Sequence, residues 1–393
     1  MLSRDVTASG AVAKKKIALM SYAMDNRDAK GTALYTRKLI EHMLEDDRFD
    51  WYLVHFDRVD DPLYAKAHEI LIPEIPHLPF GTRFVRTMLF FWKYRMERFD
   101  IIHWFQPRLY PFFWFAPSRH IVVSAHGGGD AAFPHPFIFS RFVFVNVLRY
   151  AGRFIDATIG DSLFAKEEIV EHYHLNRERV HSILLGGGEN FKMLDKRTAQ
   201  DIIQKKYQVS SPFILDVSRL QPHKNVDTLI RAYILLRDNF PKRKEQLVIA
   251  GSPVVCHEKT YALAGESKYA ADIRFIEYIK QEDLNSMYSA AELFVFPSLS
   301  EGFGLPVIEA FVSGTPVITS NVTSLPEITG DAGITVDPRN VAALAGAMNS
   351  VLSDAKLREG LVRRGVARGK GFTWKRTALQ TIKLYDDILR NRI

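Results

Sequence analysis

The sequence predicts an α/β protein of two doubly wound domains, in each of which helices cover both faces of a parallel sheet. Three observations support this prediction. The chain has 393 residues, which exceeds the length that one hydrophobic core usually serves. Apolar runs of about five to seven residues alternate with amphipathic helical patterns, as is typical of parallel sheets. The alternation is interrupted by a glycine cluster, Gly186–Gly188, and then starts again.

The first domain is expected over residues 16–195, and its first strand at residues 17–23 follows Lys14–Lys16. Residues 1–15 are interpreted as a disordered lead, because they contain no apolar centre of a signal peptide. Thr32 is a candidate cap for the first helix and Ser162 for a later one at 163–173. Further strands are expected at residues 51–56, 101–105, 121–126, 157–162 and 179–186.

The second domain is expected over residues 196–375, and a final amphipathic helix over residues 372–389. The pattern begins with a strand at 213–220 and a helix at 226–240. Ligands of doubly wound sheets bind at the carboxyl ends of the strands, so two such domains facing each other predict a ligand cleft between them. Five more strands are expected, with helices between them, at residues 246–252, 273–279, 293–298, 316–321 and 333–338.

The composition is that of a globular protein in a reducing compartment. Hydrophobic residues make up 47% and charged residues 25% of the sequence, as in ordinary soluble domains. Cys256 is the only cysteine, which excludes an internal disulfide. No apolar run approaches the length of about 18 residues that a membrane-spanning helix requires. We therefore expect a cytoplasmic protein.

Residues 298–320, which read SLSEGFGLPVIEAFVSGTPVITS, are the most informative segment for function. An apolar strand ends in a loop with Glu301, and the short helix that starts near Leu305 carries Glu309 in its second turn. The backbone N–H groups of such a loop and helix start suit a phosphate. Carboxylates are poor ligands for phosphate but good hydrogen-bond acceptors for hydroxyl groups. A phosphate site beside a hydroxyl site predicts a nucleotide sugar, whereas the alternative is an ordinary strand–helix unit with an exposed glutamate.

The string EGFGLPVIE, followed by AFVSGTPVI, resembles the signature of the family-4 retaining glycosyltransferases. These enzymes have the GT-B fold, in which two Rossmann-like domains face an interdomain cleft. The resemblance implies that Glu309 binds the ribose of the donor and that Glu301 binds the transferred sugar. It also implies that the last helix, over residues 376–393, crosses back onto the first domain. The amides that the sugar and phosphates would approach are those of Phe303, Gly304 and Leu305.

Arg219 and Lys224 follow the first strand of the second domain, in the segment SRLQPHKN. Phosphates bind at this strand-to-helix turn in doubly wound sheets, and two cations there would neutralise a diphosphate. The spacing also matches the R-x4-K pattern of the family, residue for residue. A leaving diphosphate needs such stabilisation, so both are candidate catalytic and donor-binding residues. The alternative is a pair of solvated cations, which a helix N-terminus disfavours.

His126 is the candidate catalytic residue of the first domain. It is expected to end the strand at 121–126, and the glycines that follow it leave room for a ligand. The family commonly places a histidine here, beside the reacting sugar. The aspartate that often follows is replaced by Gly127, so no role is transferred to Asp130. The alternative is a structural histidine that caps the strand. Gly31 is a second candidate contact for donor or acceptor, although the family usually has a glycine pair there.

The sequence contains no D-x-D motif, no zinc-spaced cysteine and histidine cluster and no Walker A loop. We therefore expect a reaction without a metal ion or other cofactor, with a nucleotide-diphosphate sugar as the donor substrate. The resemblance implies retention of anomeric configuration by same-face substitution. It further implies transfer of a mannose- or glucose-type hexose to a glycan or lipid-linked glycan, as in polysaccharide or lipopolysaccharide biosynthesis. The alternatives are a nucleotide-sugar epimerase of the same fold and a non-catalytic protein that binds sugar nucleotides.

Residues 80–153 contain ten basic and three acidic residues, together with 14 of the 27 phenylalanines. Such a window can be a buried core with a solvated rim, a surface for the membrane or a lipid-linked acceptor, or a nucleic-acid site. The apolar strands inside the window favour the first interpretation. The second predicts a peripheral contact with the inner face of the cytoplasmic membrane. No nucleic-acid partner is expected, because no binding module accompanies the charge.

Overall fold

The computed structural model describes residues 13–25, 31–72, 82–106, 115–127, 150, 152–210, 212–253 and 257–391, without the side chains of 82–84 and 257. Residues 1–12 of the expected lead lie outside this part, as do Cys256, Asp130 and much of the window at 80–153. The predicted disordered lead extends one residue too far, because β1 already starts at Lys15.

The first of two compact units consists of residues 1–185 and 374–393. Its seven-stranded sheet has the order β3-β2-β1-β4-β5-β6-β7, and every neighbouring pair of strands is parallel. The chain runs from β1 to β2 and β3 on one side and then returns to β4 on the other side of β1, which is the doubly wound arrangement. The strands are β1 (Lys15–Met20), β2 (Phe49–His55), β3 (His68–Leu71), β4 (Phe99–Trp104), β5 (Ser118–Ser124), β6 (Ala157–Gly160) and β7 (Val180–Ser182).

Four helices are described in unit 1, namely α1 (Thr32–Met43), α2 (Thr82–Tyr94), α5 (Leu163–Tyr173) and α14 (Trp374–Leu389). Ser162 caps α5 as expected, with its side chain accepting from the N–H of Ala165. The prediction that Thr32 caps α1 is wrong, because Gly31 holds the N-cap position and supplies no side chain. The edge strand β3 was not expected, since only four residues with one buried side chain give no strand pattern.

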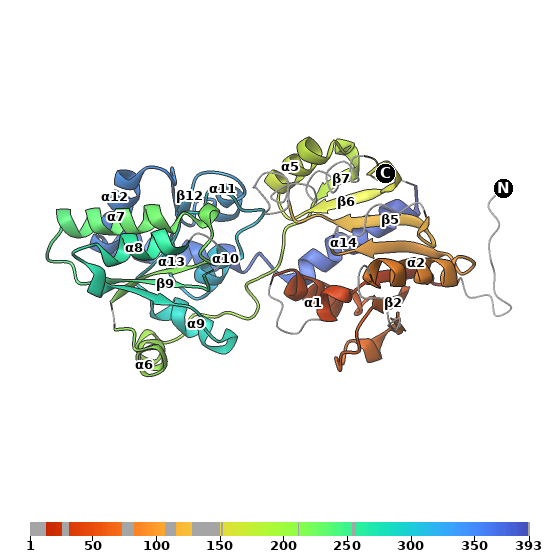
Figure 1. The fold of residues 1–393 in the computed structure, drawn as a ribbon, viewed down its shortest axis with the longest axis horizontal. Helices are drawn as coiled ribbons and strands as arrows, with labels where there is room; N and C mark the ends of the chain where they lie inside the picture. The colour runs from red at the N-terminus through yellow and green to blue at the C-terminus, as the bar shows by residue number, and fades with distance from the viewer. Residues whose placement is uncertain are drawn as a thin grey trace. The chain divides into compact units, whose positions relative to one another are not determined.

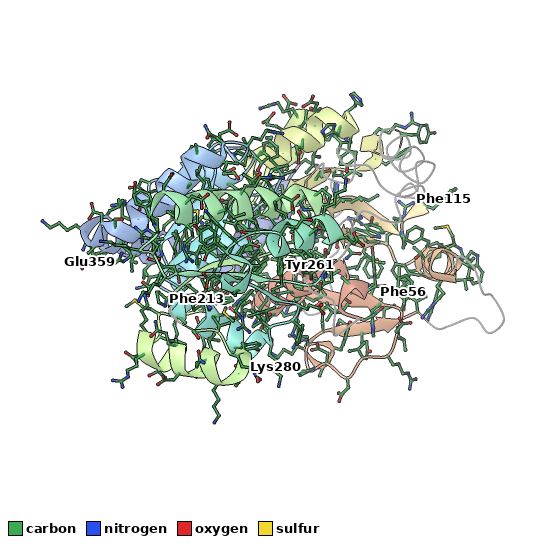
Figure 2. All side chains as sticks on the ribbon, turned by 60° about the vertical axis from the view of Figure 1, so that its left-hand side comes forward. Phe56, Phe115, Phe213, Tyr261, Lys280 and Glu359 are labelled. Atoms are coloured by element: carbon green, nitrogen blue, oxygen red, sulfur yellow. The ribbon has the colours of Figure 1, made fainter. Side chains whose placement is uncertain are left out.

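Unit 2 consists of residues 186–373 and repeats the same winding. Its six-stranded parallel sheet has the order β10-β9-β8-β11-β12-β13. The side chains of both cores are drawn in Figure 2, which labels the buried residues Phe56 in unit 1 and Phe213 in unit 2. The strands are β8 (Phe213–Val217), β9 (Gln246–Ala250), β10 (Ile273–Ile276), β11 (Leu293–Phe296), β12 (Val317–Ser320) and β13 (Ile334–Val336).

The helices of unit 2 cover its sheet, and the short η6 (Pro222–Lys224) lies between β8 and α7. The other described helices of this unit are α6 (Lys196–Tyr207), α7 (Val226–Asn239), α8 (His257–Gly265), α9 (Gln281–Ala290), α10 (Leu305–Val312), α11 (Leu325–Thr329), α12 (Val341–Ser353) and α13 (Ala355–Gly369) (Figure 1).

The division between the units lies at Leu185 and Gly186, whereas the sequence predicts it at 195 and 196. The segment between these positions is held by unit 2. The N–H of Gly188 donates to the carbonyl oxygen of Phe372 at 3.4 Å. The N–H of Leu194 donates to Oγ of Ser289 at 3.3 Å. These backbone bonds explain why residues 186–195 pack with the second sheet.

The last helix of the chain, α14, belongs to unit 1 and lies beside α1 (Figure 1). Trp374 is 2% exposed and meets the ring of Tyr35 edge to face, with 5.9 Å between centroids. Tyr385 of the same helix lies 2.5 Å from Nδ1 of His103 on β4. Burial, with a smaller contribution from the charge of His126, lowers the pKa of His103 to about 3, so this ring is neutral. The helix is therefore joined to the sheet by both apolar and polar contacts.

Replacing Trp374 with alanine should destabilise unit 1 by about 3–5 kcal/mol, because a large buried side chain leaves a cavity. Thermal unfolding followed by circular dichroism measures the change. Leu379 lies on the same helix but is 57% exposed, so Leu379→Ala is the matched control and should change stability by less than about 0.5 kcal/mol. Equal melting temperatures for Trp374→Ala and the parent protein would show that α14 does not hold the unit together.

Candidate functional site

The predicted donor residues lie at the switch point of the unit 2 sheet. The two central strands are β8 and β11. The chain leads from β8 to β9 on one side of the sheet and from β11 to β12 on the other. The loops after these two central strands therefore leave the sheet in opposite directions and open a crevice between them, where ligands of such sheets bind. Arg219 and Lys224 follow β8, and Glu301 follows β11. The topology thus brings to one edge residues that are about eighty positions apart in the sequence.

Lys224 and Glu301 form an ion pair across this crevice, with 2.5 Å between Nζ and Oε1. Their side chains are only 17% and 14% exposed. Such a desolvated pair is strongly coupled, because removing one partner leaves the other charge without compensation. The ammonium group also lies 5.2 Å from the ring centroid of Phe296, at the end of β11. The two residues that the sequence assigns to phosphate and sugar are therefore neighbours.

Asn225 fixes the loop that carries Lys224. Its backbone is left-handed, with φ 59°, and its side-chain amide donates to the carbonyl oxygens of Pro297 at 3.0 Å and Pro338 at 2.7 Å. The N–H of Leu299 donates to the carbonyl oxygen of His223 at 2.7 Å. These bonds tie the loop after β8 to the loop after β11 and fix the separation of their charged side chains.

Arg219 is exposed at the same edge and forms no ion pair with any residue that the structure describes. Its backbone position depends on Gly251, which follows β9. A Cβ atom at Gly251 would lie 1.9 Å from the carbonyl oxygen of Ser218, and the φ of 157° disfavours other residues. Glycine is therefore required for the close approach of the two loops. The exposed guanidinium is available for an anionic ligand.

The loop after β11 presents backbone N–H groups as expected. Within the described chain, the N–H groups of Phe303, Gly304 and Leu305 donate to no protein acceptor. Gly304 is the N-cap of α10 and has a φ of 115°, which favours glycine. Ser324 holds the loop by donating to the carbonyl oxygen of Phe303 at 2.7 Å. Three amides at the start of a helix make a site suited to an anion.

Glu309 lies on α10, and its partner is a residue that the sequence analysis did not identify. Tyr288 of α9 is fully buried and donates its hydroxyl hydrogen to Oε2 of Glu309 at 2.8 Å. Burial, and then the charge of Glu309, raises the pKa of Tyr288 well above its usual range, so the phenol keeps its proton. The carboxylate is thereby oriented by a fixed donor and keeps further capacity to accept hydroxyl groups.

Asp216 on β8 is a second residue that the sequence analysis did not identify. It is fully buried and accepts from Oγ of Ser218 at 2.6 Å, while its other oxygen has no hydrogen-bond partner within the described residues. Burial raises its pKa to about 7, and Glu301 adds to the rise, whereas Ser218 and Lys224 oppose it. A carboxyl group that titrates near neutrality therefore lies within the electrostatic reach of the Lys224–Glu301 pair.

His126 is positioned at the carboxyl edge of the unit 1 sheet, two residues beyond the end of β5 and with φ 38°. Its Nε2 lies 3.0 Å from the carbonyl oxygen of Phe105, which can only accept. Its Nδ1 lies 2.9 Å from the carboxylate of Asp161. Both ring nitrogens therefore face acceptors, an arrangement that suits the doubly protonated, positively charged ring. The expected strand at 121–126 is shorter, because the chain turns at His126.

Gly31 has a φ of 74° and precedes α1, at the switch point beside β1. A Cβ atom there would meet no atom within 4 Å, so the position is open. The residues before it, 26–30, lie outside the described part of the chain. No group of three or more histidine, cysteine, aspartate or glutamate side chains among the described residues could hold a metal ion.

Two family models match the chain. The model described as Glycosyltransferase Family 4 matches residues 29–186, and the one described as Glycosyl transferases group 1 matches residues 197–368. The first match covers unit 1 without β1 and α14, and the second covers most of unit 2. Together they include every predicted site residue. The motif residues Arg219, Lys224, Glu301 and Glu309 all lie in the second match.

Two similar proteins are mannosyltransferases of Escherichia coli. O-antigen chain mannosyltransferase B is 33% identical over 228 residues, which are 58% of this chain and 59% of that protein. The serotype-specific mannosyltransferase WbdA is 31% identical over 240 residues, 60% of this chain and 29% of that protein. The matched region thus spans less than two thirds of either relative.

A sucrose-phosphate synthase from Thermosynechococcus elongatus has a similar structure, with a TM-score of 0.74 and 23% identity. The alignment covers 96% of this chain and 100% of that one. The likeness extends over both units and, together with the two parallel sheets, confirms the predicted α/β fold of two doubly wound domains.

The raised pKa of Asp216 predicts a pH-dependent stability. Between pH 4 and 7 the unfolded chain has lost this proton and the folded protein has kept it, so stability falls as the pH rises through this window. Relative to the parent protein, Asp216→Asn should therefore gain about 3 kcal/mol between pH 5 and pH 8. Urea unfolding at both values measures this difference. Asp331 is exposed, and Asp331→Asn should show no such gain; a pH-independent Asp216→Asn difference would contradict the assignment.

Proposed function

Because the chain belongs to the family-4 glycosyltransferases and has their GT-B fold, we propose that it transfers a hexose from a nucleotide-diphosphate sugar to a hydroxyl group, with retention of configuration. The acceptor in this proposal is a glycan or a lipid-linked glycan. The observation that carries the proposal is the Lys224–Glu301 ion pair at the switch point, with Arg219 and three unused backbone amides beside it.

The ion pair is compatible with a donor site. A diphosphate would take the place of the Glu301 carboxylate as the partner of Lys224, and Arg219 would bind the same group. Glu301 would then accept from hydroxyl groups of the hexose. Each charge keeps a partner before and after binding, so neither is left desolvated and unpaired. Glu309, oriented by Tyr288, would accept from the ribose hydroxyl groups.

In the proposed reaction, the acceptor oxygen attacks the anomeric carbon on the face from which the diphosphate leaves. The bond between that carbon and the phosphate oxygen breaks, and this phosphate oxygen takes the proton of the acceptor hydroxyl group. Negative charge grows on the diphosphate, where Arg219, Lys224 and the amides of Phe303–Leu305 would stabilise it. For His126 to donate to a hydroxyl group of the transferred sugar, its Nε2 would first have to release the carbonyl oxygen of Phe105. Arg219, Lys224 and these amides would supply the positive charge that a divalent cation supplies in metal-dependent glycosyltransferases.

The relatives favour mannose as the transferred hexose, because two of them are named mannosyltransferases. The name of one includes an O-antigen chain, which favours a growing polysaccharide as the acceptor. No described helix has the length and apolar character needed to span a bilayer. A lipid-linked acceptor would then require a peripheral contact between this chain and the membrane.

An assay with purified protein tests the proposal against the two alternatives. The protein is mixed with a panel of UDP-, GDP-, ADP- and TDP-sugars, and thermal shift selects the donor that stabilises it. Release of nucleoside diphosphate is then followed with and without glycan acceptor. A transferase releases it with acceptor and forms a glycoside, whereas an epimerase changes the sugar without acceptor. A binding protein is stabilised by the donor but releases nothing.

Lys224→Ala, Glu301→Ala and Glu309→Ala should each lower the transfer rate about 100-fold or more, because each removes a contact to charge or hydroxyl groups in the transition state. The initial rate with the selected donor measures this loss. Lys205 is an exposed lysine on α6 of the same unit, and Lys205→Ala should leave the rate unchanged. If all three variants retained full activity, the assignment of the donor site would be wrong.

Removal of divalent cations should leave the rate within about twofold of the untreated value, since the protein's own cations balance the diphosphate. The initial rate is measured after dialysis against EDTA and again after addition of Mg²⁺ or Mn²⁺. A rate that disappears with EDTA and returns with the metal would contradict the proposed role of Arg219 and Lys224.

A further inference from the structure

The amino edge of the unit 1 sheet carries a row of exposed basic residues. This edge is opposite to the carboxyl edge at which His126 lies. Neighbouring strands are about 4.8 Å apart, so the row extends over roughly 20 Å from β1 to β7. In sheet order, the exposed cations at the strand starts are Lys15 in β1, Arg98 before β4, Arg119 in β5, Arg153 before β6 and Arg179 before β7.

The acidic groups at this edge leave the row with an excess of positive charge. The buried carboxylate of Asp100 is shared by two cations, at 3.3 Å from Nζ of Lys15 and 3.6 Å from a guanidinium nitrogen of Arg119. Its second oxygen accepts from the backbone N–H of Lys16 at 2.9 Å. Asp156 is likewise engaged, by His120 at 3.2 Å. Glu97 and Glu178 are exposed within the row, beside Arg98 and Arg179.

Large apolar side chains protrude beside this charge. Leu89, Trp92 and Met96 follow the spacing of one helical face on α2 and the turn after it, and they are 45%, 65% and 84% exposed. The opposite side of α2 is buried, with Phe90 and Phe91 in the core. Exposed apolar area of this kind is unfavourable in water and marks a contact surface.

A second exposed aromatic residue joins this group from β5. Phe115, labelled in Figure 2, is 60% exposed and precedes the start of β5. The N–H of Phe99 donates to the carbonyl oxygen of Pro117 at 2.8 Å, which holds the segment before β4 against the segment before β5. The guanidinium of Arg95 lies 4.6 Å from the ring centroid of Trp92. Cations and aromatic rings are thus combined over one continuous edge.

We propose that this amino-edge surface, consisting of Trp92, Lys93, Met96, Arg98, Phe115 and Arg119, docks on an anionic lipid bilayer. Basic side chains meet the phosphates of the headgroups, and the apolar side chains enter the boundary with the acyl chains. Charge alone would also suit an acidic protein or a nucleic acid. A nucleic acid provides no apolar layer for Trp92 and Met96, and an acidic protein would need a matching apolar patch of its own. A bilayer provides an anionic plane and a continuous apolar layer together.

Docking through the amino edge places the carboxyl edge of the same sheet away from the bilayer. A strand of six residues, such as β4, is about 20 Å long. With the amino edge on the bilayer, His126 and the other ligand-binding positions of this sheet lie above the headgroups and away from them. That geometry suits an acceptor whose reacting end extends from the lipid. The inference itself rests on the surface of unit 1 and is independent of the proposed activity.

Sedimentation of the full chain with vesicles tests the inference. The parent protein should bind vesicles of phosphatidylcholine that contain phosphatidylglycerol, should not bind phosphatidylcholine alone, and should be released by salt. The double variant Lys93→Glu/Arg98→Glu should lower the partition coefficient on the order of tenfold. Trp92→Ser/Met96→Ser should lower it as well, although the charge is unchanged.

Matched controls are available in unit 2 and on α14. Lys205 and Lys356 are exposed, so Lys205→Glu/Lys356→Glu makes the same change of net charge at other sites and should bind like the parent protein. Leu379→Ser removes an apolar side chain of similar exposure, at 57%, and should also bind normally. Thermal unfolding confirms that each variant is folded. The inference is overturned if the parent protein does not sediment at low salt, or if the controls lose as much binding as the amino-edge variants.

Discussion

Every described strand runs parallel to its neighbours in the sheet, and this constraint determines where each kind of chemistry is placed. Parallel strands put all their carboxyl ends on one edge and all their amino ends on the other. The winding reverses at the centre of each sheet, so the central loops diverge and leave space for a ligand. In unit 2 this edge holds Arg219, Lys224 and Glu301, and in unit 1 it holds His126. The amino edges are left for other contacts.

Compensation of charge explains how the charged residues of the proposed donor site hold one another in place. The side chains of Lys224 and Glu301 are too buried to carry an unpaired charge, and they form an ion pair with 2.5 Å between Nζ and Oε1. Asn225 and Gly251 fix the loops that bring them together. Asp216 interacts electrostatically with both members of the pair and has a pKa of about 7, so its own charge varies with pH in the physiological range. The site therefore needs little rearrangement of the backbone to exchange an internal partner for a ligand.

The sequence was sufficient for the fold and for placing the motif residues at strand ends, because both depend on local patterns. Apolar runs gave twelve of the thirteen described strands, and only β3 has too little buried area to show one. Arg219, Lys224 and Glu301 were found from their places after strands. Tyr288 and Asp216 could not be found in this way, since a buried tyrosine on α9 and an aspartate inside an apolar strand acquire their roles only from neighbours distant in sequence. Asp161, which fixes His126, was missed for the same reason.

The helix α14 is synthesised after unit 2, yet it completes unit 1, whose strands are synthesised before unit 2. Residues 186–373 form a continuous unit that can close its core as soon as it has left the ribosome. Translation of this stretch takes roughly 10–40 s at ordinary rates, and during that time unit 1 lacks the partner of His103 and Tyr35. Unit 1 therefore begins before unit 2 but is completed after it, and its open surface in the meantime makes it a target for a chaperone during synthesis.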